Sequence, residues 1–123
     1  MTLDELIQAV AGQVVTQRPQ RPIEIRGGCG ADLMSDVLAA IQPHAVLLTG
    51  LCNPQVVRTA TMADVAAIVF VRGKQPTSNM IALADEQTIP LITTPYGMFE
   101  ACGRLYQAGL PSFETRLMND EVA

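Results

Sequence analysis

The sequence has no tryptophan, three cysteines and one histidine in 123 residues. The single histidine, His44, leaves Ser–His or Cys–His catalysis with no choice of base. It also precedes the apolar run that begins at Ala45, at the end of the expected strand opposite a ligand cleft, so we interpret it as a surface residue. Cys29, Cys52 and Cys102 form no CxxC pair, and an odd number is a poor disulfide framework. We therefore expect reduced thiols, no metal and no cofactor, because Cys29 and Cys52 alone would supply only half of a thiolate metal site.

The chain has no excess of basic over acidic residues and no long apolar run. The formal net charge of −4 argues against a surface for duplex nucleic acid, which needs a basic face. The apolar runs are far too short to span a bilayer. No basic region followed by an apolar stretch opens the chain, so no signal peptide is predicted and a cytoplasmic location is expected. Hydrophobic residues make up 49% of the chain, which excludes general disorder.

Residues 65–71 form an unbroken apolar run that is rich in β-branched side chains. Such a run is typical of a strand buried on both faces. Shorter strands are predicted at 23–25, 45–49 and 89–93. Because helical patterns separate these strands, we predict a three-layer α/β/α fold with a mostly parallel sheet of about four strands. We expect one domain over 1–110 and a C-terminal tail over 111–123. The tail is expected either to fray or to pack on a partner chain through Phe113, Leu117 and Met118.

Most of the predicted helices carry start or stop signals. Thr2 with Glu5 forms a capping box, and Asn53 followed by Pro54 is a strong helix start. Gly12 is placed to end the first helix in a left-handed conformation. Helix caps are also predicted at Asp32, at Thr77 or Ser78, and at Thr94. The last helix carries Phe99, Cys102 and Tyr106 at helical spacing, with Gly103 expected to allow close approach by a neighbour.

Open parallel sheets bind ligands beyond the carboxyl ends of their strands, where helix N-termini also point. Glycines at these ends let a ligand approach the backbone, and helix N-termini offer free N–H groups and partial positive charge. Arg72 and Lys74 add formal positive charge, and Tyr96 can stack on a base. The predicted ligand-binding residues are Gly28, Gly30, Thr49, Gly50, Asn53, Arg72, Gly73, Lys74, Thr77, Thr94 and Tyr96. Each has a structural alternative, since glycines serve tight turns, Asn53 and the threonines serve caps, and the two cations form a solvated loop pair.

Sequence patterns for catalysis are missing. The glycine-rich stretch 27–30, expected as a turn after the strand at 23–25, matches neither GxGxxG nor the GKS/T of a P-loop. The carboxylates fall at caps, helix surfaces or element ends, and no pair is spaced for acid–base work or Mg²⁺ binding. We therefore predict that the protein is not an enzyme and has no catalytic or metal-binding residues.

Four stretches give the chain a family resemblance. They are 30–37 (GADLMSDV), 67–76 (AIVFVRGKQP), 89–94 (IPLITT) and 99–106 (FEACGRLY). Their order and spacing resemble those of the DRTGG domain, most closely its small stand-alone members, to about Leu110. The Asp-Arg-Thr-Gly-Gly signature itself is absent.

The resemblance implies a parallel α/β/α fold and a regulatory or accessory role, because such domains occur beside CBS pairs in regulated pyrophosphatases. It also implies a homodimer, and for stand-alone members a redox enzyme such as an iron-only hydrogenase as partner. Our first hypothesis is a non-catalytic module that binds an adenine nucleotide or another phosphate-bearing ligand at the strand ends. The alternative is a pure interaction subunit of a redox enzyme with no small-molecule ligand. A phosphoryl-transfer enzyme ranks last.

Overall fold

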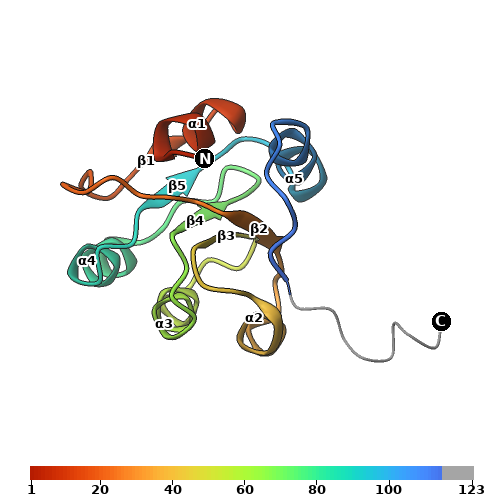
Figure 1. Ribbon diagram of the computed structural model, residues 1–123. Coiled ribbons are helices and arrows are strands. Elements are labelled where there is room, and N and C mark those ends of the chain that lie inside the picture. Colours follow the sequence, from red (N-terminus) through yellow and green to blue (C-terminus); the bar gives the residue numbers. More distant parts are fainter. Residues whose placement is uncertain (115–123) are drawn as a thin grey trace.

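The computed structural model describes residues 1–114, which form a mixed five-stranded sheet between two layers of helices (Figure 1). The strands are β1 (Gln13–Val14), β2 (Gly27–Gly30), β3 (Ala45–Thr49), β4 (Ala67–Phe70) and β5 (Leu91–Thr93). The helices are α1 (Leu3–Ala9), α2 (Met34–Ala40), α3 (Pro54–Met62), α4 (Ser78–Glu86) and α5 (Met98–Gln107). None of these five helices has the length and hydropathy needed to cross a membrane. The predicted three-layer α/β/α architecture is confirmed.

The sheet order is β1-β5-β4-β3-β2, and β2 to β5 are mutually parallel. The predicted central strand is confirmed, since β4 lies in the middle and all its residues are buried. The sheet has one strand more than the four expected. The additional strand is β1, which pairs antiparallel with β5.

Successive side chains of the strands point to opposite faces, and each face has its own core. Val46, Leu48 and Val69 pack beneath α1 and α5. Leu47 and Phe70 pack on the other face against α2, α3 and α4. Figure 1 shows this division, with α1 and α5 above the sheet and α2, α3 and α4 below it. Because both faces of β4 are buried, neither face can take polar side chains. This explains the unbroken apolar run from which β4 was predicted.

The prediction of a strand at 23–25 was wrong, because the strand is the glycine-rich stretch that follows it. Glu24 forms an isolated bridge with Thr2, and the Ile25 amide donates to the Met1 carbonyl at 2.9 Å, so this segment pairs with the N-terminus. Glycine in β2 allows close packing, since a Cβ at Gly27 would lie 2.4 Å from the Phe113 Cβ. Close approach of another segment, rather than a turn, is therefore the role of the glycine at this position.

The segment that carries Phe113 lies along the free edge of β2. The Gly28 amide donates to the Pro111 carbonyl at 2.9 Å, and the Phe113 amide donates to the Gly28 carbonyl at 2.9 Å. Residues 111–114 thus continue the sheet beyond β2. Leu117 and Met118, which were expected with Phe113 to contact a partner, lie outside the described residues.

Several helix signals are confirmed and others are wrong. Thr2 and Glu5 form the predicted capping box. The residue that ends α1 in a left-handed conformation is Ala11, with φ of 50°, and not Gly12. Gly12 instead permits close packing, because a Cβ there would lie 2.5 Å from the Ile92 Cγ2. Gly109, two residues after the end of α5, is left-handed with φ of 98°.

Helix α5 does not pack on the sheet through its aromatic residues, Phe99 and Tyr106. Ala101 and Leu105 are buried, whereas Phe99 and Tyr106 are among the most exposed large hydrophobic side chains. The expectation for Gly103 was also wrong within the described residues, since a Cβ there would meet no atom of another segment within 4 Å.

Candidate functional site

The carboxyl end of β3 presents a backbone amide to an acidic side chain from the neighbouring strand's loop. Asp32 Oδ1 accepts a hydrogen bond from the Gly50 amide at 2.7 Å and from the Thr49 hydroxyl at 3.2 Å. The Thr49 Oγ1 in turn accepts from the Leu51 amide at 3.1 Å. Asp32 was expected to cap α2, and this was wrong, because the N-cap is Leu33 and makes no side-chain capping bond. Asp32 was not among the predicted ligand-binding residues, although it also follows a strand.

The turn after β4 brings a cation to the same place. Arg72 has φ of 60° and its amide donates to the Tyr96 carbonyl at 2.7 Å. Gly73 has φ of 68°, which favours glycine, and its amide donates to the Thr94 carbonyl at 2.8 Å. A Cβ on Gly50 would lie 3.3 Å from Arg72 Nη1 and 3.5 Å from Asp32 Oδ1. The backbone of Gly50 is therefore flanked closely by the Arg72 guanidinium group and the Asp32 carboxylate.

Two helix N-termini begin beside these turns. Asn53 Oδ1 accepts from the Val56 amide at 3.3 Å, and Thr77 Oγ1 accepts from the Met80 amide at 3.3 Å, so both predicted caps are confirmed. These bonds satisfy one amide at the start of each helix. They leave the other first-turn amides of α3 and α4 without a partner inside the helix, and such groups favour anions.

Cys52 and Lys74 are neighbours at this edge of the sheet. Burial raises the pKa of the Cys52 thiol, and the nearby Lys74 ammonium group partly offsets that shift in pKa. The thiol therefore stays protonated near neutral pH and provides no thiolate. Within residues 1–114 no three His, Cys, Asp or Glu side chains gather as metal ligands.

Thr94 and Tyr96 lie near the turn after β4 but are engaged with other parts of the chain. Thr94 is buried, its hydroxyl donates to the Val10 carbonyl, and its Oγ1 accepts from the Tyr96 amide at 3.2 Å. The prediction that Thr94 caps α5 was wrong, since the N-cap is Gly97. The Tyr96 ring already faces a cation, because the Arg104 guanidinium carbon lies 4.4 Å from the ring centroid.

Gly28 and Gly30 lie inside β2, so the prediction that they form a turn after a strand was wrong. A Cβ on Gly30 would lie 3.1 Å from Cys102 Sγ and 3.2 Å from Met98 Sδ. Both glycines line a small, mainly apolar cavity of about 170 Å³ between β2 and α5. The structure thus brings Thr49, Gly50 and the turn at 72–74 together and sets these two glycines apart from them.

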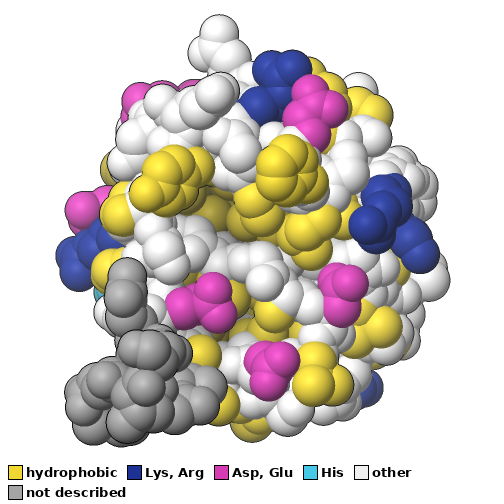
Figure 2. Space-filling model, turned by 90° about the vertical axis from the view of Figure 1, so that its right-hand side faces the viewer, with side chains coloured by type: hydrophobic (Ala, Val, Ile, Leu, Met, Phe, Trp, Pro, Cys, Tyr) yellow, Lys and Arg dark blue, Asp and Glu magenta, His cyan; other side chains and the backbone are white. Residues whose placement is uncertain are grey.

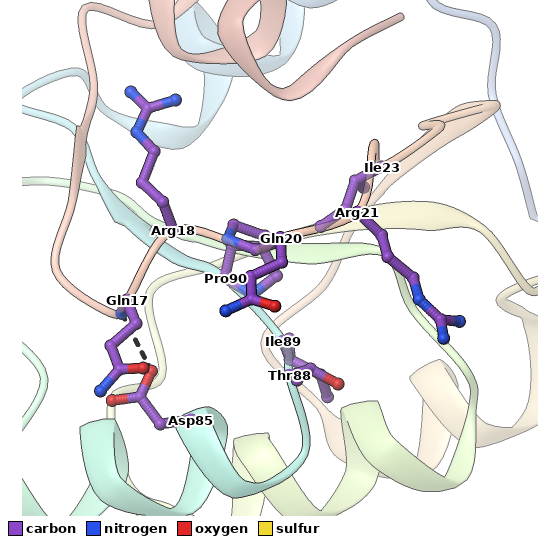
Figure 3. Close-up of a pocket in the computed structure, with 10 residues that line it drawn as sticks. Gln17, Arg18, Gln20, Arg21, Ile23, Asp85, Thr88, Ile89 and Pro90 are labelled. Atoms are coloured by element: carbon purple, nitrogen blue, oxygen red, sulfur yellow. Dashed lines mark hydrogen bonds between the residues drawn. The ribbon is translucent and has the colours of Figure 1, made fainter.

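Two larger cavities, of about 540 and 600 Å³, lie at the opposite edge of the sheet. The first is bordered by the loop at 17–23 and by residues 88–90, which precede β5 (Figure 3). The Asp85 carboxylate there accepts a hydrogen bond from the Gln17 amide at 2.9 Å. Arg18 turns away from Thr88 toward α1, where it pairs with Asp4 at 2.7 Å (Figure 3). None of the predicted ligand-binding residues lines either cavity.

Comparisons with known proteins agree with this architecture. The DRTGG domain family matches residues 5–108 of the 123. The chain therefore belongs to the DRTGG domain family. Among curated proteins, no sequence matches it significantly.

One similar solved structure is the regulatory region of Clostridium perfringens pyrophosphatase, with CBS and DRTGG domains, in complex with its activator diadenosine tetraphosphate. The two superpose with a TM-score of 0.74 at 19% sequence identity. The match covers 94% of this chain and 50% of the other, so this chain spans about half the length of that one. This similarity supports the fold.

Proposed function

We propose that this protein is a non-catalytic regulatory or accessory module that binds a phosphate-bearing ligand, an adenine nucleotide, at the carboxyl ends of β3 and β4. The observation that carries the proposal is the placement of the Arg72 guanidinium beside the bare backbone of Gly50. Glycine lets a phosphate approach the backbone, and the guanidinium group can bind two of its oxygens. The N-termini of α3 and α4, with Lys74 near the first, add further positive potential.

Asp32 determines how a phosphate group would enter this site. Its carboxylate holds the Gly50 amide at 2.7 Å, so it occupies the position of an anion in the site. A phosphate that used the same amide would have to displace this carboxylate. A ligand that instead offers hydroxyl groups, such as a ribose, could donate to Asp32 while its phosphate meets Arg72. The second arrangement avoids repulsion between two anions, and it favours a nucleotide over inorganic phosphate.

One structure of the same fold supports the adenine nucleotide as ligand. The pyrophosphatase regulatory region that shares this fold is complexed with diadenosine tetraphosphate, an activator of that protein. An activator that acts through a regulatory region requires binding and no chemistry. This agrees with the absence of a predicted catalytic set in the sequence.

The test is a thermal shift of the full chain with ATP, diadenosine tetraphosphate or inorganic phosphate, each with and without Mg²⁺. A ligand at 100 times its dissociation constant adds about 2.7 kcal/mol, a shift of several degrees in a domain of this size. The Arg72→Ala/Lys74→Ala variant should lose the shift and keep the melting temperature of the free protein. Arg21→Ala is the matched control, because that exposed arginine borders the cavity at the opposite edge. Equal shifts in both variants would refute the proposed site.

A protein-interaction subunit is the second candidate. Exposed hydrophobic side chains favour it, each of them more than half exposed: Leu33 at the N-cap of α2, Leu38 on α2, and Phe99 and Tyr106 on α5. Figure 2 shows hydrophobic side chains grouped on the side of the molecule where these helices lie. This candidate predicts no thermal shift with any nucleotide and co-elution with a purified redox enzyme such as an iron-only hydrogenase.

A further inference from the structure

The outer face of α5 combines two features that nothing else in the described chain explains. Phe99 is 93% exposed, the most exposed large hydrophobic side chain among residues 1–114. One turn further on, Gly103 occupies the middle of the helix. Apart from its chain neighbours and the backbone of its own helix, no atom lies within 4 Å of where a Cβ would be. Glycine is unfavourable inside a helix, and here no neighbouring segment requires its small size. Gly103 lowers the stability of α5, and no contact within the described residues needs its small size. This points to a contact with another molecule at this position.

The surroundings of Gly103 form a shallow hollow on the helix surface. Its border consists of Phe99, Glu100, Arg104 and Gln107. Glu100 Oε2 lies 2.8 Å from Arg104 Nη2, so opposite charges also stand one turn apart on this face. Figure 2 shows hydrophobic side chains gathered on the upper half of the side where α5 lies. The outer face of α5 therefore carries a projecting ring, a hollow, an acid and a base in a fixed order.

We propose that the outer face of α5 is a docking surface for the α5 helix of a second copy of this chain, crossing it in antiparallel orientation. In a two-fold contact, residue i of one copy meets residue j of the other, and j meets i. Phe99 of each copy then enters the hollow over Gly103 of the other. The same reversal places Glu100 of each copy beside Arg104 of the other.

The spacing of the residues on the outer face of α5 favours a second copy of the helix as the partner. Phe99 and Gly103 are four residues apart, and so are Glu100 and Arg104. When two copies of α5 cross in antiparallel orientation, the Phe99 ring of each copy faces the hollow over Gly103 of the other. The Glu100 carboxylate of each copy likewise faces the Arg104 guanidinium group of the other. Helix dipoles also oppose each other favourably in that orientation. A helix from an unrelated protein would satisfy this pattern only by coincidence, whereas a second copy satisfies it by symmetry. The inference does not rest on the proposed nucleotide site.

Analytical ultracentrifugation of the full chain over a range of micromolar concentrations tests the proposal. We expect a monomer–dimer equilibrium. Phe99→Asp and Gly103→Gln should each raise the dimer dissociation constant at least tenfold. Met62→Asp is the matched control, because Met62 is 63% exposed on α3 and should leave the dissociation constant unchanged. Circular dichroism should show that both α5 variants remain folded, since neither position is packed within the chain. A monomer at every concentration, or a dimer unaffected by both α5 variants, would overturn the proposal.

Charge reversal tests the antiparallel register. Glu100→Arg and Arg104→Glu should each weaken the dimer, because each variant places two like charges together. The double variant Glu100→Arg/Arg104→Glu restores opposite charges across the contact and should return the dissociation constant to within about threefold of the wild type. A double variant as weak as the single ones would overturn this register. The nucleotide thermal shift is measured separately, so failure of this proposal is distinguishable from failure of the nucleotide site.

Discussion

Two buried threonines should respond in opposite directions to the same substitution. Thr94 is 1% exposed, and its hydroxyl group bonds the Val10 carbonyl and the Tyr96 amide. Thr59 is fully buried in α3, and its hydroxyl has no partner among residues 1–114. Valine has nearly the shape of threonine and lacks the hydroxyl. We predict that Thr94→Val lowers the free energy of unfolding and that Thr59→Val raises it.

The contacts set the expected magnitudes. Thr94→Val removes two hydrogen bonds and leaves the carbonyl of Val10, itself fully buried, without a partner. A net loss of about 1 kcal/mol per bond, with a further cost for the buried carbonyl, gives roughly 2–3 kcal/mol. Thr59→Val removes a hydroxyl that was desolvated without compensation, a gain of about 1 kcal/mol. Both residues are β-branched, so the helix propensity at position 59 changes little. The two variants should therefore differ by about 3–4 kcal/mol.

Urea unfolding at equal protein concentration measures this difference. With a slope of about 1–3 kcal/mol per molar for a small protein, the Thr94→Val midpoint should fall by roughly 1–2 M, while the slope stays constant. Thr61→Val is a useful control, because the Thr61 hydroxyl bonds only the Val57 carbonyl of its own helix. The reasoning is refuted if Thr94→Val stays within about 0.5 kcal/mol of the wild type, or if both variants move in the same direction.

Three further predictions concern β2 and α5. Burial, together with the Glu114 carboxylate, raises the pKa of Cys29 to about 12 from 9.0, so the folded state retains the proton to higher pH than the unfolded state. The free energy of unfolding should then decline between about pH 9 and 12, less so in Cys29→Ala, as urea titrations can measure. Gly27→Ala places a Cβ against Phe113 and should speed hydrogen exchange at the Phe113 amide, whereas Gly28→Ala, with its nearest contact at 3.4 Å, should not. Gly103→Ala in a Phe99→Asp background should raise the free energy of unfolding by about 0.7–1 kcal/mol, measured by urea unfolding, because the added methyl meets open space.

Most of the fold could be predicted because its signals are local. The strand β4 is marked by consecutive apolar residues. The caps Thr2, Asn53 and Thr77 each accept a hydrogen bond from the backbone amide three positions further on. Local signals of this kind are visible in the chain order itself. The alternation of strands and helices then suffices for the α/β/α architecture.

The errors arose where a residue acts across the fold. Asp32 resembles a helix cap in sequence, but its carboxylate reaches a turn 18 positions away. Thr94 resembles a cap before a proline, but its hydroxyl serves the end of α1, 84 positions away. Gly27 resembles a turn glycine, but it makes room for Phe113. In each case the local role was chemically reasonable, but the residue instead contacts a segment that is distant in sequence.

The proposed ligand site and the proposed docking face are joined by one residue. The Tyr96 carbonyl accepts the Arg72 amide at 2.7 Å, and the Tyr96 ring lies 4.4 Å from the guanidinium carbon of Arg104, which pairs with Glu100. A ligand that moves the turn at Arg72 would therefore act on the same residue that supports the charged pair of α5. Contiguity alone does not establish coupling, which requires that the ligand bind monomer and dimer with different affinity. If it does, linkage demands that dimerisation change nucleotide affinity by the same factor by which nucleotide changes the dimer dissociation constant. If both proposals hold, these two surfaces and Tyr96 between them suffice to couple nucleotide binding to dimerisation.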